Sequence, residues 1–113
     1  DIDRSPLSAV GLKEILAWTL SLRVRLRVQG QSMSPTLEDG DHVLFRPSTT
    51  ASPGDIVVCR HPFRTDTRII KRVLEQGPDG LILRGDNPAA STDSAQLGRI
   101  PWAHLQGCVT AKM

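Results

Sequence analysis

The chain has 113 residues, of which 39% are hydrophobic and 23% charged, and its net charge is +2. This length and composition predict one small domain that spans residues 1–113. The charge is too low for a dense cationic patch, and two tryptophans and two phenylalanines are too few for a base-stacking platform. A nucleic-acid partner is therefore not expected.

Residues 1–21 are predicted to form a helical segment ahead of a β core. Leucine and isoleucine recur at helical spacing within residues 11–20, which predicts a short amphipathic helix. The most apolar stretch, residues 12–28, contains five charged side chains, whereas a membrane span needs roughly 18 apolar residues. No membrane span is expected in this chain. Whether an upstream segment or anchor was trimmed stays open, because the chain begins at Asp1.

From residue 22 the hydrophobic period changes to two. Leucine and valine alternate with arginine over residues 22–28, which predicts a strand with one buried and one cationic face. The arginine row is interpreted as a solvated face. Contact with an anionic lipid or an acidic peptide is the alternative.

The segment "QGQSMSPTLEDGD", residues 29–41, follows this strand and has glycine, proline and aspartate where a turn needs them. Two serines that flank a methionine are less ordinary in a turn. Ser32 and Ser34 are therefore candidate nucleophiles, and either of them would need a base to activate its hydroxyl.

Five more strands are predicted between turn-forming segments. They cover residues 42–46, 55–60, 68–76 and 81–86, with a last short strand near Cys108. Several short strands separated by turn signals indicate a mostly β, compact, barrel-like domain. Residues 22–113 are predicted to form this β core.

Lys71 is the candidate base. Within "RIIKRV", alternation places it on the same face as Ile69 and Val73. Burial would lower the pKa of the lysine, and a neutral amine can take a proton from a serine hydroxyl near pH 7. Alternation alone favours a different reading, in which the ammonium reaches solvent from an edge strand. The histidines accompany no motif such as G-x-S-x-G, so a Ser-His-Asp triad has no positive support.

The two cysteines, Cys59 and Cys108, lack the C-x-x-C spacing of a zinc or redox motif. They are interpreted as free thiols in a reducing cytoplasm, which is the expected location. Cys59 and His61 could offer two metal ligands, but two ligands do not close a site. Neither a metal nor an organic cofactor is expected.

Four ordered motifs, "GQSMSPTLEDGDHVL", "PGDIVV", "IIKRV" and "RGDNPAASTDS", resemble the motif boxes of the type I signal peptidase family of Ser-Lys proteases. The resemblance spans residues 28–110 and implies the signal-peptidase type of catalytic domain. Within the family, the "HP" dipeptide before an arginine-rich turn, together with "IIKRV" and "GDNPAASTDS", is most similar to the maturation proteases of nickel-type superoxide dismutase.

The resemblance also implies roles for individual residues, with Ser32 as the nucleophile and Lys71 as the general base. Ser34 is then a turn residue. The remaining implied site residues are Gly30, Gln31, Ser91 and Asp93 for the oxyanion hole and its support, and Met33 and Pro35 for substrate binding.

Two positions depart from the family pattern. Some members carry a serine two residues before the nucleophile, whose hydroxyl helps to bind the oxyanion, and here that position is Gly30. The oxyanion hole is then expected to rest on backbone donors, namely the Ser32 N–H with a neighbouring amide. The family commonly has arginine directly after "DS", where this chain has Ala95, which removes an expected partner of Asp93.

The implied activity is that of a serine endopeptidase that removes the N-terminal extension of a precursor protein. The implied substrate is the nickel superoxide dismutase precursor. Two alternatives stay open: a signal peptidase catalytic domain that acts on secretory precursors, and a non-enzymatic or self-cleaving relative such as half of a repressor. The presence of both Ser32 and Lys71 argues against an inactive relative, and the 28 residues before the motifs are too few for a helix-turn-helix.

Overall fold

The computed structural model describes residues 23–64, 66–89 and 97–113. This part of the chain confirms the predicted mostly β fold, and every predicted strand is found close to its expected position. The helix predicted for residues 11–20 lies outside the described residues. The elements in chain order are β1 (Val24–Arg27), β2 (His42–Pro47), β3 (Ile56–Arg60), β4 (Arg68–Gly77), β5 (Gly80–Arg84), the 3-10 helix η1 (Trp102–His104) and β6 (Leu105–Lys112).

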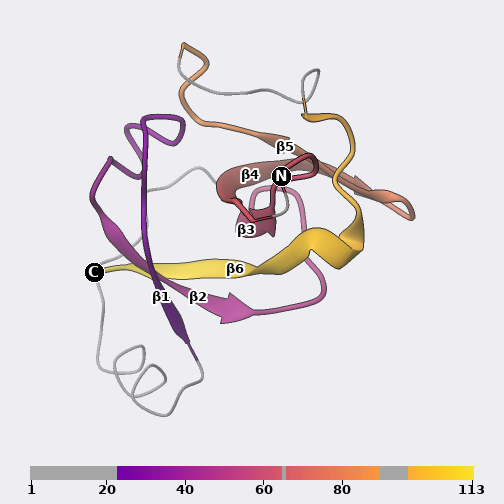
Figure 1. Cartoon of the computed structure of the whole chain (residues 1–113), viewed down its shortest axis with the longest axis horizontal. Helices are drawn as coiled ribbons and strands as arrows, with labels where there is room; N and C mark the ends of the chain where they lie inside the picture. The colour runs from indigo at the N-terminus through magenta and orange to yellow at the C-terminus, as the bar shows by residue number, and fades with distance from the viewer. Residues whose placement is uncertain (1–22, 65, 90–96) are drawn as a thin grey trace.

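The strands form one antiparallel sheet in the order β1-β2-β6-β3-β4-β5. The last strand, β6, therefore lies between β2 and β3. It joins the β1–β2 hairpin to the β3–β4–β5 strands, in each of which neighbouring strands are consecutive in the sequence. In Figure 1, β6 (yellow) crosses the middle of the molecule between β1–β2 and β3–β4–β5. The register shifts within the β2–β6, β3–β6 and β4–β5 pairs. Such irregularities bend and twist a sheet, so they curve this one.

Strand β3 is the centre of the core because both of its faces are covered. Val57 and Cys59 belong to one cluster of buried side chains, and Ile56 and Val58 belong to a second cluster. A continuous apolar run is typical of a strand that is buried on both faces. The second cluster includes side chains from residues 28–41, so this long connection between β1 and β2 packs onto the sheet.

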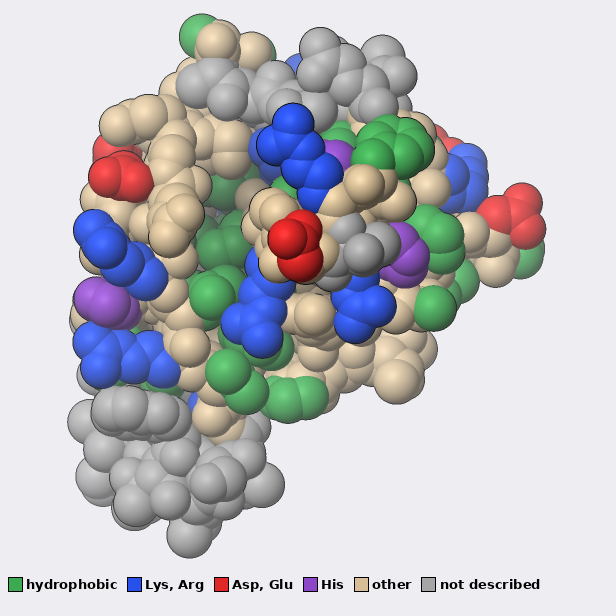
Figure 2. All heavy atoms as spheres, in the orientation of Figure 1, with side chains coloured by type: hydrophobic (Ala, Val, Ile, Leu, Met, Phe, Trp, Pro, Cys, Tyr) green, Lys and Arg blue, Asp and Glu red, His purple; other side chains and the backbone are tan. Residues whose placement is uncertain are grey.

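The surface of the described part carries basic side chains in separate places. On the face shown in Figure 2, the Lys and Arg side chains form several groups with other residues between them. Few large apolar side chains are exposed, and Phe63 in the β3–β4 turn is the most exposed of them. No helix within the described ranges is long and apolar enough to cross a membrane.

Candidate active site

The connection between β1 and β2, residues 28–41, holds Ser32 in a closed loop. At the base of the loop, the Val28 N–H donates to the Asp41 carbonyl at 2.7 Å, and the Gly40 N–H donates to the Val28 carbonyl at 2.8 Å. Met33 and Leu37 are fully buried in the second core cluster. The buried side chain of Met33 therefore anchors the backbone at Ser32, while the Ser32 side chain stays partly accessible.

The backbone at Gly30, where some family members have a serine, adopts a conformation that favours glycine. Gly30 has a φ of +84°, in the left-handed region that L side chains rarely adopt. Its N–H donates to Asp39 Oδ1 at 2.8 Å, which fixes this conformation. A serine at position 30 would therefore be strained even though the space around it is open.

The two serines of the loop have different surroundings. The Ser34 hydroxyl donates to Glu38 Oε1 at 2.7 Å, one helical turn along the chain. Such local bonds are typical of side chains that stabilise a turn. Ser32, in contrast, lines a groove on the surface. The geometry thus assigns Ser34 to the loop and leaves Ser32 as the candidate nucleophile.

Lys71 lies in β4 directly opposite Val57 of β3. Its neighbours on the same face, Ile69 and Val73, pack in the first core cluster, as the alternation predicts. The lysine is only 5% exposed, so it does not reach out into solvent as an edge-strand lysine would. Burial lowers its pKa, because removal from water disfavours the ammonium form. Lys71 is thus a desolvated candidate for the base.

Ser32 and Lys71 line the same groove, which has a volume of about 580 Å³. One wall comes from the end of β1 and the residues after it, and the other from the turn before β4 and the first half of β4. The lining residues are Leu26, Arg27, Val28, Gln29, Ser32, Met33, Asp66, Thr67, Arg68, Ile69, Ile70 and Lys71.

Both walls of the groove present strand edges that lack a partner strand in the described part of the chain. Among the described residues, strand β1 ends the sheet and pairs only with β2. Strand β4 pairs with β3 from Arg68 onward, but its pairing with β5 begins only at Arg72. The β5 side of residues 68–71 is therefore unpaired among the described residues. Open edges of this kind can accept an extended segment of another chain.

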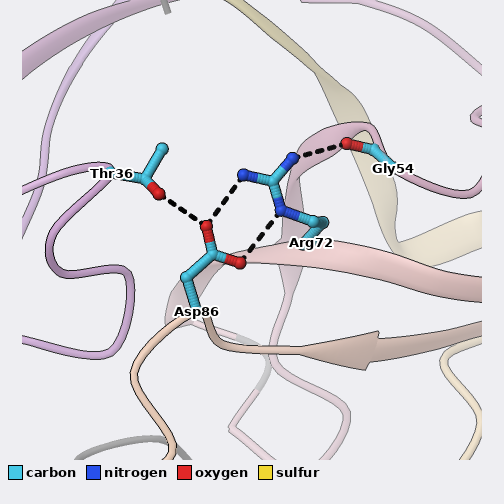
Figure 3. A network of polar contacts seen from close by, with 4 residues as sticks. All are labelled: Thr36, Gly54, Arg72 and Asp86. Atoms are coloured by element: carbon cyan, nitrogen blue, oxygen red, sulfur yellow. Dashed lines mark hydrogen bonds and ion pairs between the residues drawn. The ribbon is translucent and has the colours of Figure 1, made fainter. Parts of the chain in front are cut away.

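A buried ion pair connects the lysine strand to the serine loop. Arg72, the residue after Lys71, donates through Nε and Nη2 to Asp86 at 2.9 and 2.8 Å, and the two side chains are 3% and 7% exposed. Asp86 also accepts a hydrogen bond from the Thr36 hydroxyl at 2.7 Å, and Arg72 Nη1 donates to the Gly54 carbonyl at 2.7 Å. Figure 3 shows the two carboxylate oxygens shared between these donors. Residues from distant segments of the chain are thus tied together by one polar network.

The histidines lie elsewhere and have structural contacts. His61 Nδ1 accepts hydrogen bonds from two N–H groups of its own turn, at 3.0 and 3.1 Å. His104 contacts the Arg60 carbonyl at 3.2 Å, and His42 pairs with Arg27 in the β1–β2 ladder. None of the three lines the groove. A histidine base for Ser32 therefore has no geometric support.

Both cysteines are buried free thiols. Burial raises the pKa of Cys59 to about 12, with a smaller contribution from the nearby Cys108. Thiols of this kind stay protonated and are poor nucleophiles and metal ligands. Within residues 23–64, 66–89 and 97–113, no group of three or more His, Cys, Asp or Glu side chains could hold a metal ion.

The other predicted site residues are placed less centrally or not described. Met33 is buried and also contributes to the groove wall, and its role in substrate binding stays a prediction. Gln31 and Pro35 are exposed and do not line the groove. Ser91, Asp93 and Ala95 lie outside the described residues.

Sequence reasoning did not identify the ion pair as part of the site. Alternation placed Lys71 on an apolar face and gave no sign that Arg72 is buried, whereas both side chains are buried, on opposite faces. The available signal was the "GDN" of the fourth motif, which supplies Asp86 and the asparagine after it. The apolar groove residues Leu26 and Ile70 were also missed as site residues, because each looks like an ordinary strand residue in the sequence.

Residues 21–108 match the model of the Peptidase S24-like family. The chain is similar to the mitochondrial inner membrane protease subunit 1 of Mus musculus, with 30% identity, and of Xenopus tropicalis, with 29% identity, each over 108 residues. Each match covers 74% of this chain and 65% of the relative. The chain thus spans less than two thirds of the length of these relatives. These similarities support the resemblance to signal-peptidase-like proteases.

Proposed function

Because the chain belongs to the Peptidase S24-like family, we propose that it is a serine endopeptidase that removes the N-terminal extension of a precursor protein with a Ser32–Lys71 dyad. The observation that carries this proposal is the groove, which Ser32 lines together with a lysine that is 5% exposed. Family membership supports the reaction class, and the burial of Lys71 supports its role as a base.

In the proposed reaction, neutral Lys71 accepts the hydroxyl proton of Ser32 while the serine oxygen attacks the scissile carbonyl. The tetrahedral intermediate collapses, the peptide bond breaks, and the amine product leaves with a proton from Lys71. The acyl group stays on Ser32 as an ester. Lys71 then takes a proton from water while the water oxygen attacks the ester. The ester bond to Ser32 breaks, the new carboxyl terminus leaves, and Lys71 returns the proton to the Ser32 oxygen.

The substrate is proposed to bind as an extended strand between the two groove walls. The open edges of β1 and of residues 68–71 offer backbone donors and acceptors, which give affinity for a peptide without regard to its sequence. Leu26, Met33 and Ile70 make the groove partly apolar, which favours apolar substrate side chains in it. The added strand would carry its scissile carbonyl past Ser32.

Two substrate classes are candidates for this groove. The motif resemblance, with "IIKRV" and "GDNPAASTDS", supports the nickel superoxide dismutase precursor. The similarity to two proteins named mitochondrial inner membrane protease subunit 1 supports a signal-peptidase-like protease without favouring that substrate, so a secretory precursor is the second candidate. A cytoplasmic location, expected from the two thiols, stays a prediction.

Cleavage assays with purified chain should separate these substrates. We expect cleavage of the nickel superoxide dismutase precursor at the junction between its extension and the mature amino terminus, detected by mass spectrometry of the products. A secretory precursor of similar length serves as the competitor. Preferential cleavage of the secretory precursor would favour the signal peptidase alternative, and cleavage of the chain within itself would favour a self-cleaving relative.

The same assay tests whether a metal ion takes part. Since Ser32 and Lys71 supply both the nucleophile and the base, a chelator such as EDTA should leave the rate of cleavage unchanged. Loss of activity in EDTA that is restored by zinc or nickel would contradict this expectation.

The rate of cleavage should rise with pH as Lys71 loses its proton. Burial lowers the pKa of Lys71, so its neutral form becomes abundant at a lower pH than that of an ordinary lysine. We therefore expect kcat/KM to be low in acid and to rise through a midpoint clearly below about 10.4, the value of a solvated lysine. The measurement is a pH–rate profile on one precursor. A midpoint at or above the solvated value would contradict a buried lysine base.

A further inference from the structure

The residue after Asp86 contacts the serine loop through both its backbone and its side chain. The Asn87 N–H donates to the Ser32 carbonyl at 2.9 Å, and Asn87 Nδ2 donates to the Gln31 carbonyl at 3.0 Å. Asn87 Oδ1 accepts a hydrogen bond from the Ala89 N–H at 3.2 Å. Because the oxygen end of the amide has its own donor, the nitrogen end must face Gln31. The side-chain amide of Asn87 is thus oriented at both ends.

The hydrogen bond to the Gln31 carbonyl also determines where the Ser32 N–H points. These two groups belong to the same planar peptide unit, which is trans, and in a trans peptide they point in opposite directions. The Gln31 carbonyl accepts a second hydrogen bond from the Ser34 N–H at 3.1 Å. With its carbonyl held by two donors, this peptide unit turns the Ser32 N–H away from Asn87.

The Ser32 N–H has no hydrogen-bond acceptor among the described residues, and Ser32 lines the groove. A backbone donor next to the nucleophile is what an oxyanion hole requires. Position 30 is glycine, so no hydroxyl from that residue can share this task. The orientation of the Ser32 N–H therefore matters more for oxyanion binding here than in a site where a side-chain hydroxyl also donates to the oxyanion.

We propose that Asn87 is a positioning residue that orients the Gln31–Ser32 peptide, so that the Ser32 N–H meets the oxyanion of the tetrahedral intermediate. No bond forms or breaks at Asn87, and no proton moves there. It acts on the reaction only through the peptide that it holds. The inference rests on the proposed function, in which Ser32 is the nucleophile.

The test is the variant Asn87→Ala, assayed on the precursor that the wild-type chain cleaves. Complete removal of an oxyanion donor lowers kcat by about 10²–10³-fold. Asn87→Ala keeps the Ser32 N–H but orients it less well, so kcat should fall by a smaller factor, about 10- to 100-fold. KM should stay unchanged, because the substrate carbonyl makes this interaction mainly in the transition state. The affinity for a peptide boronate, which forms a tetrahedral adduct with serine, should fall by a similar factor. Binding of intact precursor to the Ser32→Ala chain should not change when Asn87→Ala is added.

The matched control is Ser34→Ala, which removes another side-chain hydrogen bond of the same loop, to Glu38, and leaves both donors to the Gln31 carbonyl in place. It should keep kcat and boronate affinity. Asn87→Asp is the second variant, since it keeps the size and the acceptor for Ala89 but lacks the donor to Gln31. It should lower kcat at least as much as Asn87→Ala.

Different outcomes identify which idea is wrong. If Ser32→Ala or Lys71→Met retains cleavage, the proposed function fails and this inference fails with it. If those variants are inactive while Asn87→Ala and Asn87→Asp keep kcat, or change KM alone, the positioning role is overturned and the dyad stands. If both Asn87 variants lose the folded state in a melting experiment, Asn87 is structural, which also overturns the proposal.

Discussion

Replacement of Lys71 with methionine should abolish precursor cleavage while the chain keeps its fold. Methionine resembles lysine in length and is apolar, so it suits a side chain that is 5% exposed and packed in β4. It cannot accept the hydroxyl proton of Ser32, and a serine without a base is a weak nucleophile. We expect a loss of at least about 10³-fold in kcat/KM, because the nucleophile and the base of the proposed Ser32–Lys71 dyad act as one unit and neither works without the other. The measurement is single-turnover cleavage of purified precursor, with circular dichroism to verify the fold.

The control for this variant is Lys112→Met in β6, where the lysine is 39% exposed and lies 3.5 Å from Asp41. It should cleave at the wild-type rate, because it makes the same chemical change outside the groove. Ser32→Ala should be as inactive as Lys71→Met, and the double variant should be no worse than either, because the two residues act together. Substantial cleavage by Lys71→Met would exclude the lysine as the base and leave the activation of Ser32 without a structural explanation.

Replacement of Asp86 with alanine should lower the free energy of unfolding more than the loss of a surface ion pair or of both members of the buried pair. It leaves the Arg72 guanidinium, 3% exposed, without its bidentate carboxylate, and it removes the acceptor of the Thr36 hydroxyl. Loss of one partner of a buried pair typically costs about 3–5 kcal/mol. A domain of this size has a free energy of unfolding of about 5–15 kcal/mol, so the melting temperature should fall by roughly 10 °C or more.

A surface ion pair provides the comparison. Glu75 lies 3.6 Å from Arg99, and both side chains are substantially exposed, so Glu75→Ala should cost less than about 1 kcal/mol. Replacement of both members of the buried pair, Arg72→Met with Asp86→Ala, should restore part of the stability, because no unpaired charge is left in the interior. Equal melting curves for Asp86→Ala and Glu75→Ala would show that the buried pair does not stabilise the fold.

The positions of the strands could be predicted from the sequence. Alternating leucine, valine and arginine before residue 29 indicated β1, and the apolar run at 56–59 indicated β3. Both signals are local, since side chains of a strand point alternately to its two faces. The order of the strands could not be read in this way. No local sequence pattern predicts that β6 lies between β2 and β3, because this pairing joins segments that are far apart in the chain.

The candidate dyad illustrates the same limit. The motifs identify Ser32 and Lys71, but they identify them by resemblance, and the alternation around Lys71 alone favoured an exposed ammonium group. Its burial comes from the packing of β4 against β3 and the first core cluster. Whether residues 1–113 form one domain with a helical segment over 1–21 stays a prediction, as do the roles of Ser91 and Asp93.

The sequence by itself thus determined which segments are strands, which connection carries the candidate serine, and which lysine is its candidate base. Only the tertiary structure decided that Ser32 and Lys71 share a groove, that Arg72 pairs with Asp86, and that Asn87 holds the Gln31 carbonyl. Strand formation follows from the two-residue period of neighbouring side chains. The tertiary features depend on residues up to 56 positions apart, which meet only when the sheet has formed. These features are the desolvation of the Lys71 amine, the pairing of Arg72 with Asp86 and the direction of the Ser32 N–H.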